Sequence, residues 1–450
     1  MIHQQGSVSS SLQKGKKISK HILIATFGSL GDLYPYMAIA KEMRTRGHRA
    51  VIATNEIYRQ MIESEGIEFR AIRPNGLINV EEEGEFIELL RDSQQALDYG
   101  VSYLIGPHLR ATYSDLLEPV QEADLLLTHH LAFAGTLAAE KTGTPRVSTA
   151  LAPISFMSVY DLPTLSPLPT SAYEAALTLV ANDAKHRFFR WKARFWSAPV
   201  RQLRAELGLT PSCDPVFEGQ HSPELVLALF SQILAAPQPD WPPQTRVTGF
   251  PFYDRQEHQA LSPDLVKFLS AGPPPIVFTL GSLMVWTPGN FYLEGAIAAQ
   301  KLGYRSILLM GQAAHSIPAH QLPEGAIAVD YASHSALFPH VAAIAHHGGV
   351  GTTAQALRAG RPMLVVPYAY DQPDNAARLV RLGVARTIER QHCTADRIAA
   401  ELKLLLFDPN YAAKATEVGH LLQAEDGVGA ACDAIEAFLN DEMGRRSDKS

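Results

Sequence analysis

The fold class is decided by residues 21–54, HILIATFGSLGDLYPYMAIAKEMRTRGHRAVIAT. A β-branched run at 21–27 precedes a glycine turn, and apolar residues then recur at helical spacing from Tyr34 to Met43. The next apolar run, 48–54, predicts a second strand. A strand, a helix and a strand within about 35 residues are typical of a parallel βαβ unit. This stretch therefore predicts an α/β protein.

The same alternation continues along the chain in two series. In the first series we expect helices at 56–65, 83–118 and 132–142 and strands at 67–72, 123–129, 145–150 and 225–230. Prolines and turn residues crowd positions 236–258, as is typical of a connection between domains. In the second series we expect helices at 290–303 and 352–359 and strands at 275–282, 306–311, 326–332, 343–349 and 362–368. Such alternation predicts two doubly wound, Rossmann-like parallel-sheet domains, with ligands bound in a cleft at the carboxyl ends of the strands.

Composition excludes several classes of function. The 450 residues include 46 acidic and 39 basic ones, so the net charge of -7 does not attract nucleic acid. The three cysteines form no C-x-x-C pair, which argues against a disulfide framework or a thiolate metal site and favours a reducing cytoplasm. No apolar run approaches the ~18 residues that span a bilayer. Residues 1–19 lack the apolar stretch of a secretory signal and are expected to be a disordered polar tail.

The clearest chemical signal lies in residues 345–376, AHHGGVGTTAQALRAGRPMLVVPYAYDQPDNA. Gly349 and Gly351 allow the backbone to approach a ligand closely, and Thr352 and Thr353 can cap a helix whose free N–H groups favour an anion. Such a turn suits a diphosphate. A tight turn without a ligand is the alternative.

Polar side chains follow both strands of this segment. His347 can donate to a phosphate oxygen, while Asp371 and Gln372 offer acceptor and donor groups for sugar hydroxyls. A diphosphate site next to a sugar site predicts a nucleotide sugar as the ligand. Taken singly, His347 could be a hydrogen-bonded core histidine, and Asp371 could simply open the next helix.

These residues resemble the C-terminal signature of the family 1 nucleotide-sugar glycosyltransferases, which have the GT-B fold. The signature reads here His347-Gly348-Gly349-Val350-Gly351-Thr352, then Gln355, Gly360-Arg361-Pro362-Met363, Pro367 and Asp371-Gln372. The variant HHGGxGTT with DQxDNAxR is similar to the bacterial and sterol-type branch, which includes rhamnolipid-type rhamnosyltransferases. The resemblance extends from about residue 20 to residue 440.

The resemblance implies how the chain is divided. The expected segments are a tail (1–19), an N-terminal acceptor-binding domain (20–235), a linker (236–258), a C-terminal nucleotide-sugar-binding domain (259–424), a helix that returns to the N-terminal domain (425–440) and a polar tail (441–450).

The resemblance also implies roles for single residues of the C-terminal domain. The expected contacts are Ser282, His347, Gly349, Gly351 and Thr352 with the diphosphate, Asp371 and Gln372 with the transferred sugar, and Tyr331, Ala332 and Gln355 with the nucleobase and ribose. Tyr331 stands in place of the family's base-stacking Trp, and Gln355 in place of its ribose-binding Glu.

Glycosyl transfer with inversion requires a base on the acceptor side of the cleft. Asp32 is the only ionisable side chain in the turn GSLGDLYP, where relatives carry His or Asp, so we expect it to be the base. An Asp before an apolar helix is also a common cap, and both roles can hold together. Relatives orient the catalytic His with an Asp on a later strand. The matching place here holds His129, with His130 as its rival, which suggests that acid and imidazole have exchanged positions. A core histidine without a catalytic role is the alternative.

The expected donor is UDP-glucose, another UDP-sugar or a dTDP-sugar. The expected acceptor is a hydrophobic alcohol, phenol or lipid near Phe27, Gly28 and Leu30. The D-x-D motif that usually holds Mg²⁺ or Mn²⁺ in the other major glycosyltransferase fold does not occur, so we expect no metal and no cofactor. A nucleotide-sugar 2-epimerase of the same fold and a non-catalytic nucleotide-sugar-binding protein are the alternatives. A Rossmann oxidoreductase is disfavoured because GSLGDL lacks the G-x-G-x-x-G spacing.

One basic aromatic stretch, KHRFFRWKARFWSAPVRQLR at 185–204, departs from the acidic balance. It could form a helix on a membrane surface. Alternatively, the helix packs its aromatic residues on the core of the first domain or lines an apolar acceptor pocket. Base stacking with nucleic acid is a remote third possibility, because the rest of the chain is acidic.

Overall fold

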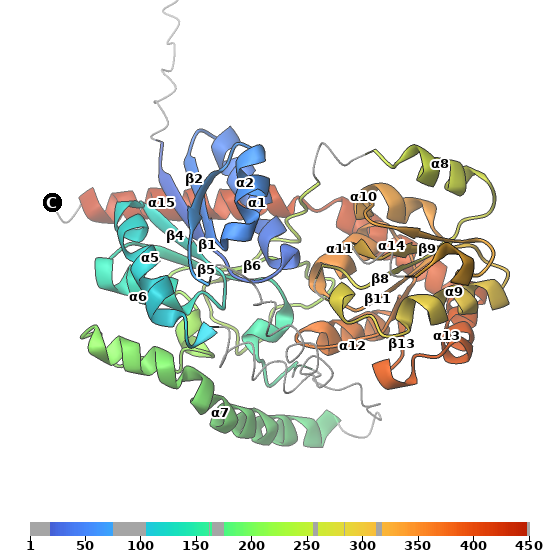
Figure 1. Cartoon of the computed structure of the whole chain (residues 1–450). Helices are drawn as coiled ribbons and strands as arrows, with labels where there is room; N and C mark the ends of the chain where they lie inside the picture. Colours follow the sequence, from blue (N-terminus) through green and yellow to red (C-terminus); the bar gives the residue numbers. More distant parts are fainter. Residues whose placement is uncertain are drawn as a thin grey trace, which may run out of the picture.

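A computed structural model describes residues 19–74, 105–161, 163, 175–254, 260–282, 284–311 and 317–447. These residues form two parallel β-sheets, one in each half of the chain (Figure 1). Helices cover both sheets, which confirms the predicted pair of Rossmann-like domains. Short 3₁₀ turns lie at Glu56–Tyr58, Pro153–Phe156, Glu218–Gln220, Met284–Trp286, Ala319–Gln321, Phe338–His340 and Arg390–His392.

The N-terminal sheet has the strand order β3-β2-β1-β4-β5-β6-β7, and its strand pairs are parallel. Its strands are β1 (His21–Ala25), β2 (Arg49–Thr54), β3 (Glu68–Ala71), β4 (Leu125–Thr128), β5 (Arg146–Ala150), β6 (Val226–Ala228) and β7 (Thr245–Val247). The helices of this half are α1 (Leu30–Thr45), α2 (Arg59–Ser64), α5 (Leu109–Glu122), α6 (Phe133–Thr142) and α7 (Ala175–Glu206).

The C-terminal sheet has the order β10-β9-β8-β11-β12-β13 and is also parallel. Its strands are β8 (Ile276–Thr279), β9 (Ser306–Leu309), β10 (Ala326–Val329), β11 (Ala343–His346), β12 (Met363–Val365) and β13 (Ala385–Thr387). The helices are α8 (Pro263–Ser270), α9 (Phe291–Lys301), α10 (His334–Leu337), α11 (Val350–Arg358), α12 (Gln372–Leu382), α13 (Ala395–Phe407) and α14 (Pro409–Gln423).

The central strands are covered on both faces. Ile22, Leu23 and Ile24 of β1 are fully buried, as are Val277 and Phe278 of β8. Strands buried on both faces read as continuous apolar runs rather than as alternating patterns. This is why these strands could be recognised in the sequence.

The structure differs from the sequence prediction in two places. β7 lies inside 236–258, where only a connection was expected, because an edge strand of three residues is too short to stand out among prolines. α11 begins at Val350, two residues before the expected helix at 352–359. The predicted helical stretch 83–118 lies partly outside the described residues, and its remainder belongs to α5. The tail 1–19 lies almost wholly outside the described residues.

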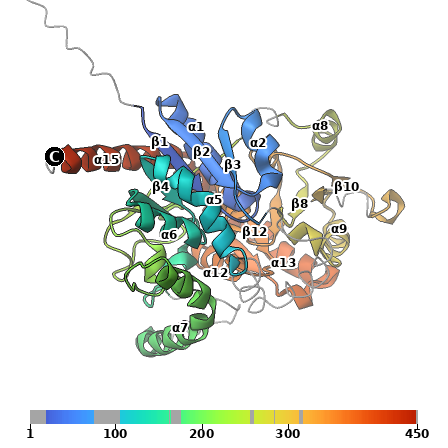
Figure 2. The ribbon, with the colours of Figure 1, turned by 60° about the vertical axis from the view of Figure 1, so that its left-hand side comes forward.

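The last helix, α15 (Gly427–Ser447), packs against α1 of the N-terminal domain (Figures 1 and 2). Its residues Cys432 and Ile435 are fully buried in one apolar cluster with Ile39 of α1. Arg46 at the end of α1 pairs with Glu436 of α15 at 3.0 Å. This is the position expected for the helix at 425–440. Among the described residues, no helix is both long enough and apolar enough to span a bilayer.

Candidate active site

The two domains approach each other at the starts of two helices. α1 follows β1, and α11 follows β11. A Cβ atom placed on Gly351 of α11 would lie 3.9 Å from the Cα atom of Gly31 in α1. The turn that carries the predicted base and the turn of the predicted diphosphate site therefore lie next to each other, one in each domain.

Asp32 is held by the first turn of α1. The helix N-cap is Ser29, and Asp32 stands three residues later in a capping box, where its Oδ2 accepts the Ser29 backbone N–H at 2.7 Å and the Ser29 hydroxyl at 3.2 Å. Asp32 is therefore not the N-cap itself, because the Ser29 hydroxyl accepts the N–H of Gly31. The carboxylate is fixed in direction while its Oδ1 faces His129.

His129 follows β4 and is buried. Its Nδ1 accepts the backbone N–H of Leu131 at 3.1 Å, so the neutral ring carries its proton on Nε2. That nitrogen lies 3.4 Å from Asp32 Oδ1. The structure thus brings together the pair expected from the sequence. The rival, His130, packs its ring against that of His129, with the centroids 4.0 Å apart.

α11 starts without a side-chain cap. Its N-cap is Gly349, and no side chain accepts a hydrogen bond from the first turn. The expectation that Thr352 and Thr353 cap this helix is wrong: both lie inside it, and the Thr353 hydroxyl donates to the Gly348 carbonyl at 3.4 Å. A helix start without such a cap leaves backbone N–H groups available for an anion.

His347 lies between two glycines at this helix start. A Cβ atom on Gly281 would lie 2.6 Å from His347 Cε1, and one on Gly349 would lie 2.3 Å from its Nε2, so both positions must lack a side chain. Burial lowers the pKa of His347 to about 3, which keeps the ring neutral near pH 7. Ser282, a further predicted phosphate contact, is exposed in the turn after β8.

Asp371 and Gln372 form the start of α12. Gln372 is buried, and its Oε1 accepts the backbone N–H groups of Tyr368 and Ala369 at 2.9 and 3.0 Å, so this oxygen holds the loop after β12. Asp371 Oδ2 accepts from Asn375 Nδ2 at 2.7 Å. Burial, and to a smaller extent the negative charges of Asp32 and Asp374, raise the pKa of Asp371 to about 7. Asp371 and Asp32, one in each domain, are therefore close enough for the charge of Asp32 to raise the pKa of Asp371.

The predicted nucleobase and ribose residues lie in the loop after β10 and in α11. Tyr331 is exposed after β10, whereas Ala332 is buried. Gln355 lines a groove of about 490 Å³ together with Phe252 and Asp254. Its Oε1 accepts from Arg358 Nη2 at 2.8 Å, and the same nitrogen pairs with Asp254 at 2.9 Å. The side-chain oxygen of Gln355 is thus already hydrogen-bonded to Arg358.

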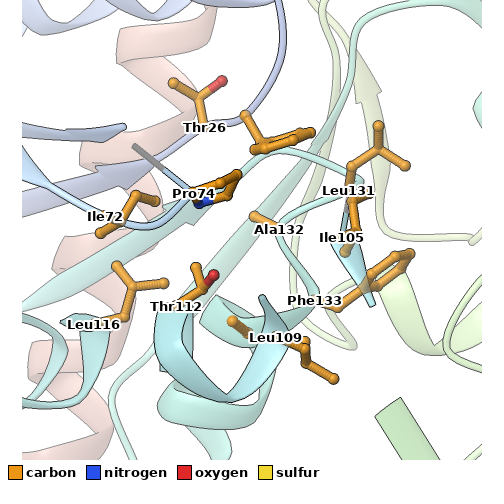
Figure 3. Close-up of a pocket in the computed structure, with 12 residues that line it drawn as sticks. Thr26, Ile72, Pro74, Ile105, Leu109, Thr112, Leu116, Leu131, Ala132 and Phe133 are labelled. Atoms are coloured by element: carbon orange, nitrogen blue, oxygen red, sulfur yellow. The ribbon is translucent and has the colours of Figure 1, made fainter. Parts of the chain in front are cut away.

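A narrow apolar pocket lies in the N-terminal domain (Figure 3). Two of its lining residues contact the Asp32–His129 pair: the Thr26 hydroxyl donates to the Asp32 carbonyl at 3.2 Å, and the Leu131 N–H donates to His129 Nδ1. Its volume is about 30 Å³, which is room for one small group of an acceptor. The lining comprises Thr26, Phe27, Ile72, Pro74, Ile105, Leu109, Thr112, Leu116, Leu131, Ala132, Phe133 and Ala134. Gly28 follows with a φ of +127°, and a Cβ atom there would lie 2.3 Å from Asp32 Oδ2, so this position requires glycine. Leu30, the third residue expected near the acceptor, is the first residue of α1.

Comparison with known proteins identifies the family. Residues 22–154 match the glycosyltransferase family 28 N-terminal domain, and residues 305–426 match the erythromycin biosynthesis protein CIII-like C-terminal domain. The chain is 33% identical over 434 residues to O-mycaminosyltylonolide 6-deoxyallosyltransferase of Streptomyces fradiae, covering 93% of this chain and 97% of that relative. The chain belongs to the family 1 glycosyltransferases.

Two further comparisons agree. The glycosyltransferase is 28% identical over 437 residues to a sterol 3-beta-glucosyltransferase of Aspergillus terreus. The match includes 93% of this chain but only 30% of the length of that relative. The crystal structure of glycosyltransferase VinC in complex with dTDP superimposes with a TM-score of 0.63 and 22% identity, over 93% of this chain and 98% of VinC. That likeness supports the GT-B fold.

One group in this glycosyltransferase was missed by the sequence analysis. Arg378 of α12 is buried, and its Nε donates to Asp374 at 2.8 Å while its Nη1 reaches Asp161 of the N-terminal domain. Arg381 also contacts Asp161, at 3.2 Å. Asp374 and Arg378 lie in the quoted DQxDNAxR motif, four residues apart, so their pairing on one helix face could have been found. Asp161 could not, because no local pattern links it to α12.

Proposed function

We propose that this glycosyltransferase moves a sugar from a UDP- or dTDP-sugar to a hydroxyl of a hydrophobic small molecule or lipid, with inversion and without a metal ion, and that Asp32 is the general base. The position of Asp32 carries the proposal. Its carboxylate is oriented by hydrogen bonds from Ser29 and lies 3.4 Å from His129 Nε2, and the uncapped start of α11 approaches the same helix turn.

The reaction follows from this arrangement. Asp32 removes the acceptor's hydroxyl proton while the acceptor oxygen attacks the anomeric carbon and the bond to the diphosphate breaks. His129 Nε2–H, 3.4 Å from Asp32 Oδ1, would close to a hydrogen bond with the carboxylate during the reaction. The negative charge that develops on the leaving diphosphate is stabilised by the N–H groups at the start of α11 and by neutral His347, because such preorganised donors act strongly in a narrow cleft. Asp371 and Gln372 hold the sugar between the two sides.

The relatives bear on the substrates. By their names, one relative transfers a 6-deoxyallosyl group to O-mycaminosyltylonolide and another a glucosyl group to sterols, and VinC binds dTDP. From these relatives we infer a hydrophobic alcohol as the acceptor here, and the apolar pocket of about 30 Å³ beside Asp32 would take one small group of it. Both UDP-glucose and dTDP-sugars fit the proposal as donors.

We propose that no cofactor is needed and that chelators leave the rate unchanged, since helix N–H groups and His347 supply the stabilisation that a divalent cation would otherwise provide. We place the reaction in the cytoplasm, because the thiols of Cys213, Cys393 and Cys432 are free and suit a reducing compartment.

The test uses the purified chain with UDP-glucose and dTDP-sugars and a panel of macrolide, sterol and phenol acceptors, with the product and its anomeric configuration determined by mass spectrometry and NMR. We expect an inverted product with or without EDTA. Asp32→Asn should lower kcat by about 10²–10⁴.

The matched control is Ser29→Ala, which removes the capping hydroxyl but keeps the carboxylate. It should lower the free energy of unfolding by about 1 kcal/mol and keep most of the activity. Near-native turnover by Asp32→Asn would contradict the role of Asp32. Binding of a nucleotide sugar without turnover of any donor would instead favour a non-catalytic nucleotide-sugar-binding protein.

A further inference from the structure

α7 presents two different faces. One face packs into the N-terminal domain through Ala193, Trp196, Val200 and Leu203, which share an apolar cluster with residues of α5 and α6. This matches the expectation that the basic aromatic helix packs on the core of the first domain. The helix runs along the outside of the molecule in both views (Figures 1 and 2). Its opposite face is therefore open to solvent.

That outer face carries an aromatic stripe, which we define as Phe188, Trp191 and Phe195. Their exposed fractions are 65%, 52% and 71%. Spacings of three and four residues place them in one row along the helix, and the rings of Phe188 and Trp191 stack with centroids 5.9 Å apart. Solvation of three large rings is unfavourable by about 1.5–3 kcal/mol each relative to full burial, so the stripe is suited to contact with an apolar phase.

Cations surround the stripe. Residues 184–204 contain seven Lys and Arg and no Asp or Glu, in a chain whose net charge is -7. Arg187, Arg190, Arg201 and Arg204 are paired with carboxylates, namely Asp183, Glu218, Asp214 and Glu140. The cations on the outer side differ: Lys185 is exposed, and Arg194 lies over the Trp191 ring at 5.6 Å.

We propose that the aromatic stripe and its flanking cations dock this enzyme on the surface of an anionic phospholipid bilayer. Phe and Trp side chains enter the boundary between headgroups and acyl chains, while Lys and Arg reach up to the lipid phosphates. The charge selects the lipid, since each Lys or Arg near an anionic surface contributes about 1 kcal/mol of attraction. A groove on a partner protein could hold the rings but would not require the flanking cations Lys185 and Arg194. The docking does not depend on the identity of the acceptor.

The test measures co-sedimentation of the full chain with vesicles of phosphatidylcholine alone or with about one third phosphatidylglycerol at low salt. We expect binding only to the anionic vesicles, and weaker binding as salt is raised. Replacement of the stripe by alanine, Phe188→Ala with Trp191→Ala and Phe195→Ala, should weaken binding at least about tenfold. Lys185→Glu with Arg194→Glu should also weaken it. On binding, the emission of Trp191 should shift to the blue, and Trp191→Phe should remove that shift but keep the binding.

Phe407→Ala is the matched control, because Phe407 is 63% exposed but lies on α13 of the C-terminal domain, and its loss should not change vesicle binding. Circular dichroism and a thermal melt establish that each variant is folded. The proposal is overturned if the chain fails to bind anionic vesicles, if the triple alanine variant binds as the parent does, or if sedimentation velocity shows that the stripe joins two copies of the chain instead.

Discussion

Asp371 is the residue whose protonation should be visible in kinetics. Its pKa is about 7 because the site is buried and faces the charge of Asp32. As the pH falls through 7, Asp371 gains a proton, so one of its oxygens becomes a donor and the neutral carboxyl group accepts hydrogen bonds from the donor sugar more weakly. We expect kcat/KM for the donor to fall on the acid side with an apparent pKa near 7. In Asp371→Asn this limb should be missing and kcat/KM should be low at every pH. A limb unchanged in Asp371→Asn would assign it to another group.

The same residue sets a pH dependence of stability. Its folded pKa lies above the ordinary value of 3.8, so the fold favours the protonated form. Stability is therefore lost as the pH rises from about 4 to above 7, where the folded protein must ionise a buried acid that an unfolded chain ionises easily. Asp371→Asn escapes this loss. The difference in melting temperature between Asp371→Asn and the parent should therefore favour the variant more at about pH 8 than at about pH 5. An equal difference at both pH values would argue against a raised pKa.

At the scale of residues, the sequence predicted the Asp32–His129 pair but not the groups that hold it. The prediction worked because β1 and β4 are neighbours in the sheet, so residues just after them lie close together. Ser29 as the N-cap and Thr352 inside α11 were not predicted. A shift of one or two residues in a helix start decides such roles, and sequence patterns do not fix helix ends that closely.

Among the elements, α11 offers a direct test of the diphosphate site. Gly349 has an ordinary φ of -60°, so alanine is allowed there by the backbone, but its Cβ would lie 2.3 Å from His347 Nε2. Gly349→Ala should displace the His347 ring and lower kcat/KM by about 10–100-fold with little loss of stability. His347→Ala is the reference variant: if Gly349→Ala acts through the His347 ring, it should add little further loss in the His347→Ala background. A further loss of similar size in the double variant would mean that the turn itself, and not His347, is what matters.

α15 should behave as part of the N-terminal core. Ile435 is fully buried there together with Ile39 of α1. Ile435→Ala should lower the free energy of unfolding by about 2–5 kcal/mol, as measured by urea denaturation. Ala437→Ser changes an exposed site on the same helix and should cost less than about 1 kcal/mol. A small effect of Ile435→Ala would show that α15 is only loosely attached.

Elements were predicted well where burial imposes a pattern and poorly elsewhere. Continuous apolar runs identified β1 and β8, which are covered on both faces. β7 was missed because three residues at a sheet edge produce no such run. For α7, composition indicated an aromatic helix, but only packing decides that Trp196 is buried while Phe195 is exposed.

For the whole molecule, the contact between Asp161 and Arg378 should control how the two domains meet. Arg378 is buried, so removal of one of its carboxylates leaves its charge poorly compensated. Asp161→Asn should reduce kcat/KM by about tenfold or more and increase the radius of gyration measured by X-ray scattering. Arg381→Gln removes the exposed contact to the same Asp161 and should change little, because surface pairs contribute about 0–1 kcal/mol. Matching effects in the two variants would contradict a special role for Arg378.

The pair of domains could be predicted from sequence because the alternation of strands and helices starts again after the proline-rich stretch. How the domains face each other could not, since it rests on contacts such as Asp161–Arg378 between residues far apart in the chain.

The return of α15 has a consequence for how the chain matures on the ribosome. β1 and α1 are synthesised first, yet the helix that covers Ile39 is made after the entire C-terminal domain. The N-terminal half therefore leaves the exit tunnel with an apolar surface that has no cover until α15 has been synthesised. Domains usually fold in order of synthesis. Here the domain that starts first should be the last to be completed, and for that interval it is the part that most needs a chaperone.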